Sequence, residues 1–101
     1  MPSTTTTSST YAEEGVVYKI QLIAVYKFNS EHSRYSTPKN YGSLVTEYIP
    51  DRNLTRVLLS QFNSKEEAEQ ILMSIKDHPD FGTALVVKYV NGTRIDPWAK
   101  Y

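Results

Sequence analysis

Residues with catalytic potential are few and scattered in this sequence of 101 residues. His32 and His78 fall in an expected loop and at an expected helix end, where each is predicted to be a surface side chain. Glu66, Glu67 and Glu69 lie in the first turns of an expected helix, and negative charge is favourable there because the helix N-terminus is partially positive. No nucleophile triad, phosphate-binding loop, paired-carboxylate arrangement or zinc-ligand spacing occurs. We therefore predict a protein that is not an enzyme and needs no cofactor or metal.

Charge and hydropathy narrow the possible partners. Lysine plus arginine and aspartate plus glutamate are both 11, so the formal net charge at pH 7 is zero. No long-range field then favours nucleic acid, an anionic membrane or an acidic partner. Apolar runs are about four residues long, against the roughly 20 that a membrane helix needs. We expect a monomeric domain that is not inserted in a membrane, does not bind nucleic acid and recognises its ligand by local contacts.

Composition divides the chain into three parts. Residues 1–14 are rich in serine and threonine and are expected to form a flexible linker or tail without the features of a secretory signal. Residues 15–96 have the composition of one globular domain with a single core. Residues 97–101 are expected to be a C-terminal tail. The domain is therefore predicted to be attached to a larger protein.

Hydrophobic periodicity predicts the elements of this domain. Alternation predicts a strand within residues 16–28, and turn residues 50–53 join two further strands, 44–49 and 54–62, into an antiparallel hairpin. Residues 29–42 contain Pro38 and no helical periodicity, so at most one helical turn is expected there.

The second half of the chain has the clearest local signals. Ser64 and Glu67 form a capping box, and an apolar stripe follows on one face of the expected helix: Ala68, Ile71, Leu72 and Ile75. Pro79 prevents continuation of the helix much beyond Asp77. A strand over residues 83–90 and an Asn91-Gly92 turn follow, with a short extra strand expected over residues 93–95.

This order predicts an α+β fold with a ferredoxin-like, or RNP-like, four-stranded antiparallel sheet. The series is strand, helix, strand, strand, helix, strand, and its first helix is degenerate. The remaining helix is expected to pack on one face of the sheet, with Ile20, Leu22, Val57 and Leu59 pointing toward it. The other face of the sheet is expected to be open to solvent.

Alternation places a mixed set of side chains on that open face. Amide, hydroxyl and charged groups can hydrogen-bond to sugar oxygens, while apolar groups can contact the C–H face of a sugar ring. An ordinary solvated sheet face is the alternative interpretation, because exposed polar residues are common. Tyr48 and Tyr89 are either additional stacking surfaces or edges of the core. The predicted glycan-binding residues are Lys19, Gln21, Ile23, Arg56, Leu58, Ser60, Gln61 and Lys88.

Three segments, residues 20–23, 55–68 and 84–89, together resemble the SPOR (sporulation-related repeat) family. Residues 20–23 are similar to the family's first-strand motif, residues 55–68 to its strand, corner and capped helix, and residues 84–89 to its closing strand. Two departures from the pattern occur: Ile23 replaces a glycine, and Ser60-Gln61 replaces a Gly-Pro corner. Both departures add side chains near the expected ligand face.

The resemblance implies a function that the residue pattern alone does not. Known members of the family bind peptidoglycan glycan strands, in characterised cases strands stripped of stem peptides and often at cell division sites. For this chain it implies a cell-wall carbohydrate-binding module in the periplasm or cell envelope, which targets or anchors a larger envelope protein.

Two other functions use the same expected fold. An RNA-binding module would stack bases on aromatic residues of an open sheet face, but the expected strand aromatics and a positive net charge are missing. A protein-interaction domain would use the exposed edge of strand 44–49 or a strand added from residues 93–101, where Trp98 and Tyr101 supply apolar surface.

Overall fold

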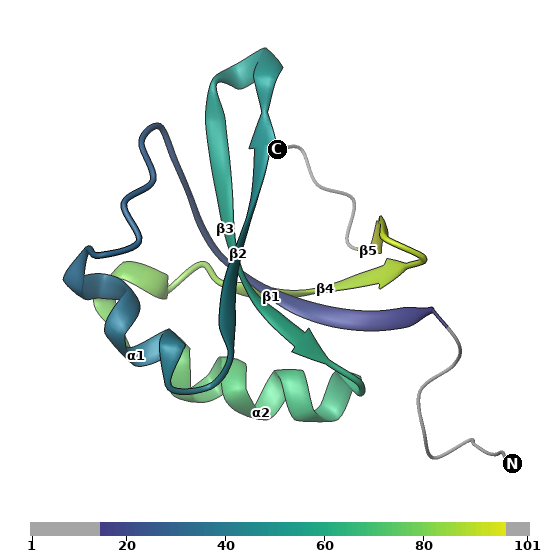
Figure 1. Ribbon diagram of the computed structural model, residues 1–101. Helices are drawn as coiled ribbons and strands as arrows, with labels where there is room; N and C mark the ends of the chain where they lie inside the picture. The colour runs from purple at the N-terminus through teal and green to yellow at the C-terminus, as the bar shows by residue number, and fades with distance from the viewer. Residues whose placement is uncertain (1–14, 97–101) are drawn as a thin grey trace, which may run out of the picture.

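The structure, a computed structural model, describes residues 15–96 as five strands and two helices. All the paired strands are antiparallel, and their order across the sheet is β2-β3-β1-β4-β5 (Figure 1). Both helices lie on the same side of this sheet in the view of Figure 1. The strands are β1 (Val16–Val25), β2 (Ser43–Ile49), β3 (Leu54–Phe62), β4 (Leu85–Val90) and β5 (Thr93–Asp96), and the helices are α1 (Ser36–Lys39) and α2 (Lys65–Lys76).

The predicted α+β class and antiparallel sheet are confirmed, and the sheet has five strands because the extra strand expected over residues 93–95 forms as β5. The fifth strand forms because the Asn91-Gly92 turn sends the chain back along β4. Both turn residues have positive φ, 50° at Asn91 and 84° at Gly92, as a two-residue hairpin turn requires. The predicted tails, residues 1–14 and 97–101 with Trp98 and Tyr101, lie outside the described residues.

Residues 29–42 form only short helical segments, as the lack of helical periodicity predicted. Helix α1 has four residues and follows a short 3₁₀ turn, Ser33–Tyr35. Tyr35 and Pro38 from this segment are nevertheless buried, and the Tyr35 ring lies 6.4 Å from the ring of Phe81. A packed aromatic loop therefore supplies apolar contacts that a full first helix would otherwise make.

The main core lies between α2 and the sheet, as the alternation predicted. Ile20, Leu22, Val57 and Leu59 are each at most 1% exposed and belong to one cluster with Ala68 and Ile75 of α2. At the N-terminus of α2, the Ser64 hydroxyl accepts a hydrogen bond from the Glu67 backbone N–H at 3.1 Å. The cap and the apolar stripe thus fix where α2 begins and which side it buries.

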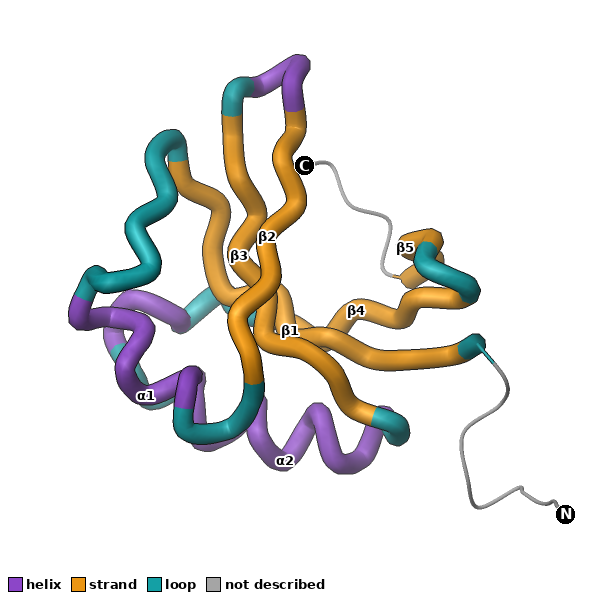
Figure 2. The backbone as a smooth tube through the Cα atoms, viewed as in Figure 1, coloured by secondary structure: helices purple, strands orange, loops and turns teal. Residues whose placement is uncertain are grey.

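The face opposite α2 is partly buried, contrary to the prediction of a fully open face. Leu58, Val87 and Tyr89 form a second apolar cluster there and are at most 2% exposed. A flat sheet would hold β2 and β4, which have two strands between them, roughly 14 Å apart. Figure 2 shows instead that the sheet is strongly curled. The curl brings the Tyr89 hydroxyl of β4 within 2.5 Å of a Glu47 carboxylate oxygen of β2. Curling makes this face concave and covers its centre.

Candidate binding site

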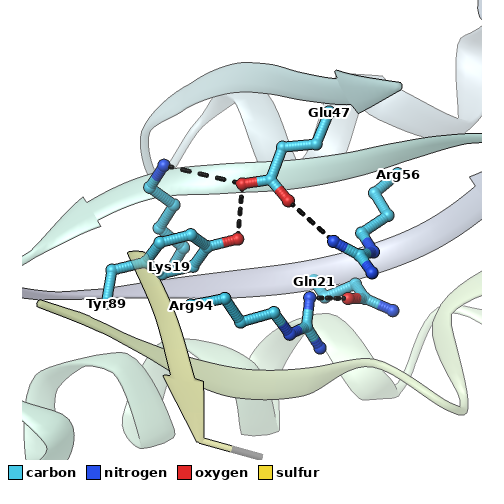
Figure 3. Close-up of polar contacts among 6 residues, drawn as sticks. All are labelled: Lys19, Gln21, Glu47, Arg56, Tyr89 and Arg94. Atoms are coloured by element: carbon cyan, nitrogen blue, oxygen red, sulfur yellow. Dashed lines mark hydrogen bonds and ion pairs between the residues drawn. The ribbon is translucent and has the colours of Figure 1, made fainter. Parts of the chain in front are cut away.

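Six polar side chains meet on the concave face opposite α2, and we call them the polar cluster (Figure 3). Three of them, Lys19, Gln21 and Arg56, were predicted as ligand-binding residues, and the structure brings these three together. All five strands contribute to the cluster. Its members are Lys19 and Gln21 of β1, Glu47 of β2, Arg56 of β3, Tyr89 of β4 and Arg94 of β5.

Glu47 is the centre of the polar cluster. Arg56 Nη1 donates to Glu47 Oε1 at 3.1 Å, and the Tyr89 hydroxyl donates to Oε2. Lys19 Nζ lies 4.0 Å from the same Oε2 and 4.3 Å from the centre of the Tyr89 ring. This carboxylate therefore accepts two hydrogen bonds and forms an ion pair with the Lys19 ammonium, which also gains a cation–π contact.

Strand pairing explains why these side chains converge. Glu47 lies directly opposite Arg56 in the β2–β3 ladder, and Tyr89 lies directly opposite Arg94 in the β4–β5 ladder. The fifth strand thereby places Arg94 where its Nη1 donates to Gln21 Oε1 at 2.6 Å. Cross-strand neighbours of opposite charge stabilise a sheet, so the ladders and the polar contacts support each other.

The polar cluster is desolvated but still reachable by solvent. The side chains of Lys19, Glu47 and Arg56 are 20%, 28% and 15% exposed, respectively. Arg56 Nε is buried and has no hydrogen-bond partner among the described residues. Lys19 and Arg56 share one carboxylate in the cluster, so local charge is positive although the whole chain is neutral. Groups in such an environment interact with an anionic ligand more strongly than fully hydrated groups do.

Burial changes the acidity of two members of the polar cluster. Desolvation raises the pKa of the Tyr89 hydroxyl, and its hydrogen bond to Glu47 raises that pKa further. Desolvation is also the main cause that lowers the pKa of Arg94, and the nearby positive charge of Arg56 lowers it further. Tyr89 therefore stays a neutral donor at physiological pH, while arginine remains charged.

The structure places Ile23 and Lys88 on the α2 side of the sheet, so their predicted face is wrong. A bulge makes Leu22 an extra residue between the pairs Gln21–Leu58 and Ile23–Val57, which turns Ile23 toward the main core. On β4 the alternation has the opposite phase to the one predicted, so Lys88 lines a small pocket with Lys65 of α2. The sequence could not show this phase, because adjacent valines make both faces of β4 apolar.

The other predicted site residues lie outside the polar cluster. Leu58 is on the predicted face but is completely buried, so it supports the cluster from below and cannot contact a ligand. Ser60 is partly buried near the end of β3, where it pairs with Ser43 of β2, and Gln61 is exposed. Leu58 packs with the Tyr89 ring of the cluster through apolar contact only.

Sequence reasoning missed Glu47 and Arg94 and left the role of Tyr89 open. The short turn after Ile49 could have identified Glu47 as a neighbour of Arg56, because the turn sets the register of the hairpin and this register pairs Glu47 with Arg56. Tyr89 is 2% exposed, so it is a core-edge residue with a hydrogen-bonded hydroxyl. Arg94 depended on the fifth strand and could not be assigned to a face before that strand was paired.

The two histidines lie outside the polar cluster, and each accepts a local backbone hydrogen bond. His32 Nδ1 accepts from the Arg34 backbone N–H, and His78 Nδ1 accepts from the Asp80 backbone N–H, both at 3.1 Å. Each histidine thereby caps a 3₁₀ turn. Within residues 15–96, no group of three or more histidine, cysteine or acidic side chains could hold a metal ion. No helix in the same range is long and apolar enough to cross a membrane.

Comparisons of the chain with protein-family models, with curated proteins and with solved structures found no match.

Proposed function

We propose that residues 15–96 form a non-catalytic module that binds peptidoglycan glycan strands on the concave face opposite α2. The polar cluster is the observation that carries the proposal. It offers an amide, a carboxylate, an ammonium group and two guanidinium groups side by side on a partly desolvated surface. Sugar hydroxyls can donate to Glu47 and Gln21 and accept from Arg56 and Lys19.

The local positive charge favours a glycan that carries carboxylates. A strand stripped of its stem peptides has free carboxylates on the lactyl groups of its muramic acid units. Arg56 suits such a group, because a guanidinium binds a carboxylate in a planar, bidentate geometry. Arg56 Nε is buried and has no hydrogen-bond partner among the described residues, so the contact with Glu47 does not use all the donors of this guanidinium.

The fold is compatible with this proposal, and we propose a ferredoxin-like, SPOR-like core with β5 added at its edge. The segment that resembles the family most, residues 55–68, forms β3, the corner and the capped start of α2 in the expected order. Ile23 packs on the α2 side, so this departure from the family pattern does not obstruct the concave face. The corresponding location would be the periplasm or cell envelope, as part of a larger envelope protein.

One observation favours a second candidate, a protein-interaction domain. β2 is an edge strand of the sheet, and Tyr48 on this strand is 60% exposed. An extended peptide could pair with the outer side of β2 and pack against Tyr48. An RNA-binding function has less support, because Tyr89, the aromatic residue of the polar cluster, is too buried to stack on a base.

The test is a titration of the isotope-labelled protein with purified glycan strands, followed by backbone amide shifts. We expect shifts centred on Lys19, Gln21 and Arg56 with stripped strands, and weaker ones when stem peptides cap the lactyl carboxylates. Arg56→Gln should weaken binding, whereas Lys88→Gln, on the opposite face, should not. Binding that is unaffected by Arg56→Gln would contradict the proposed site, and no binding of either strand would contradict the function.

A further inference from the structure

A pocket of about 590 Å³ lies at the end of the β2–β3 hairpin, and we call it the hairpin pocket. We propose that it is a second sugar site, which takes a neutral pyranose ring of the same strand. The inference rests on the proposed function for its choice of a sugar as ligand. The pocket is lined by Tyr26, Ile49, Asp51, Arg52 and Leu54.

The lining has the chemistry that a sugar ring requires. Tyr26 is 74% exposed, so its ring is available to the C–H face of a pyranose. Ile49 and Leu54 add partly buried apolar surface beside it. The Asp51 carboxylate can accept from sugar hydroxyls, and the Arg52 guanidinium can donate to them. A sugar site combines apolar contact for the ring with polar groups for the hydroxyls, and this lining supplies both.

The turn that closes the hairpin holds this pocket in shape. Residues Pro50–Arg52 form a 3₁₀ turn, and Asn53 follows in the left-handed region at φ 52°. The Asn53 backbone N–H donates to the Pro50 carbonyl at 3.2 Å, and the Tyr48 hydroxyl donates to Asn53 Oδ1 at 2.9 Å. These contacts fix the backbone that presents Asp51 and Arg52, so little ordering is needed when a ligand binds.

The hairpin pocket and the polar cluster lie on the same face of the hairpin. The pair Ile49–Leu54 is two residues along the ladder from Glu47–Arg56, and side chains two residues apart point to the same face. The two sites are therefore about 7 Å apart along the strand. Ala24 of β1 pairs with Arg56. Tyr26 follows directly after β1, two residues beyond Ala24, and lines the pocket.

Because both sites lie on one face of the β2–β3 hairpin, a bound glycan strand would run along the hairpin. One strand of linked sugars can place an acidic unit on the polar cluster and a neighbouring neutral unit in the hairpin pocket. Figures 1 and 2 show that the β2–β3 hairpin extends well beyond the rest of the sheet, so a strand lying along it would not meet the helices. The two sites would then select a polymer over a single sugar by linked binding.

The probe for this site is a neutral oligomer of N-acetylglucosamine, which lacks carboxylates. We expect amide shifts at Tyr26, Asp51 and Leu54 in the unmodified chain. Tyr26→Ala should abolish them and should weaken binding of stripped glycan strands about three- to tenfold, the equivalent of one aromatic contact. Tyr26→Phe should retain both. Tyr41→Ala is the matched control, because Tyr41 is also an exposed tyrosine, 40% accessible, but does not line the pocket.

The possible results separate this inference from the proposed function. Absence of shifts at the pocket with the neutral oligomer, or equal affinity of Tyr26→Ala and the unmodified chain for stripped strands, would overturn the second site. If stripped strands bind and Arg56→Gln weakens them while Tyr26→Ala does not, the proposed function stands alone. If the neutral oligomer shifts the pocket and stripped strands never perturb the polar cluster, the sugar site stands and the proposed peptidoglycan function fails.

Discussion

Replacing Glu47 with glutamine removes the only carboxylate of the polar cluster while it preserves the size of the side chain. The carboxylate accepts from Arg56 and from Tyr89 on different oxygens. A glutamine has a single acceptor oxygen, so it can serve just one of these two donors. Lys19 also loses the negative charge that lies 4.0 Å from its ammonium. We therefore expect Glu47→Gln to lower the free energy of unfolding.

The magnitude follows from the burial of the groups involved. Breaking a fully buried ion pair costs about 3–5 kcal/mol, whereas an exposed pair contributes about 0–1 kcal/mol. The Glu47 and Arg56 side chains are 28% and 15% exposed, so the cost should lie between these limits. We expect about 2 kcal/mol. For a domain of this size, such a loss lowers the unfolding temperature by roughly 8–16 °C.

Thermal and denaturant unfolding of matched variants would measure this effect. Glu69→Gln is the control, because Glu69 is exposed on α2 and its replacement should change stability by less than about 0.5 kcal/mol. A double-mutant cycle of Glu47→Gln with Tyr89→Phe should give a coupling energy of about 1 kcal/mol, since the two side chains share a hydrogen bond. If Glu47→Gln unfolds at the same temperature as Glu69→Gln, the polar cluster is not a cooperative network.

Three further predictions concern other parts of the fold. Folding raises the pKa of Tyr89 above its ordinary value of 10.0, so the native state holds this proton more tightly than the unfolded state does. The free energy of unfolding should therefore not depend on this group below pH 10 and should fall as the pH rises above 10. Denaturant titrations at alkaline pH should show a less steep fall for Tyr89→Phe than for the unmodified chain. Leu58→Ala should cost about 2–5 kcal/mol in urea unfolding, because Leu58 is fully buried on the face opposite α2; a cost near zero would mean that this face is open. Ser64→Ala should cost about 1 kcal/mol, whereas Ser64→Asp should keep the cap of α2, and equal stability of the two variants in thermal unfolding would contradict the capping role.

Local chemistry determined much of this fold from the sequence alone. The capping box at Ser64 and the apolar stripe after it specify where α2 begins and which side it buries. The alternation around Ile20 and Val57 identifies the core face of two central strands, because a one-residue slip would expose the whole apolar set. The turn residues at positions 50–53 and 91–92 then specify two hairpins.

The candidate site depended on features that local patterns do not contain. The bulge at Leu22 reverses the face of Ile23, and the phase of β4 rests on packing, because its valines suit either face. The curl of the sheet is a property of all the strands together, and it alone brings Tyr89 against Glu47. The sequence determined which strands carry polar side chains; the tertiary structure decided which of them meet, because contacts across several strands depend on the twist of the whole sheet.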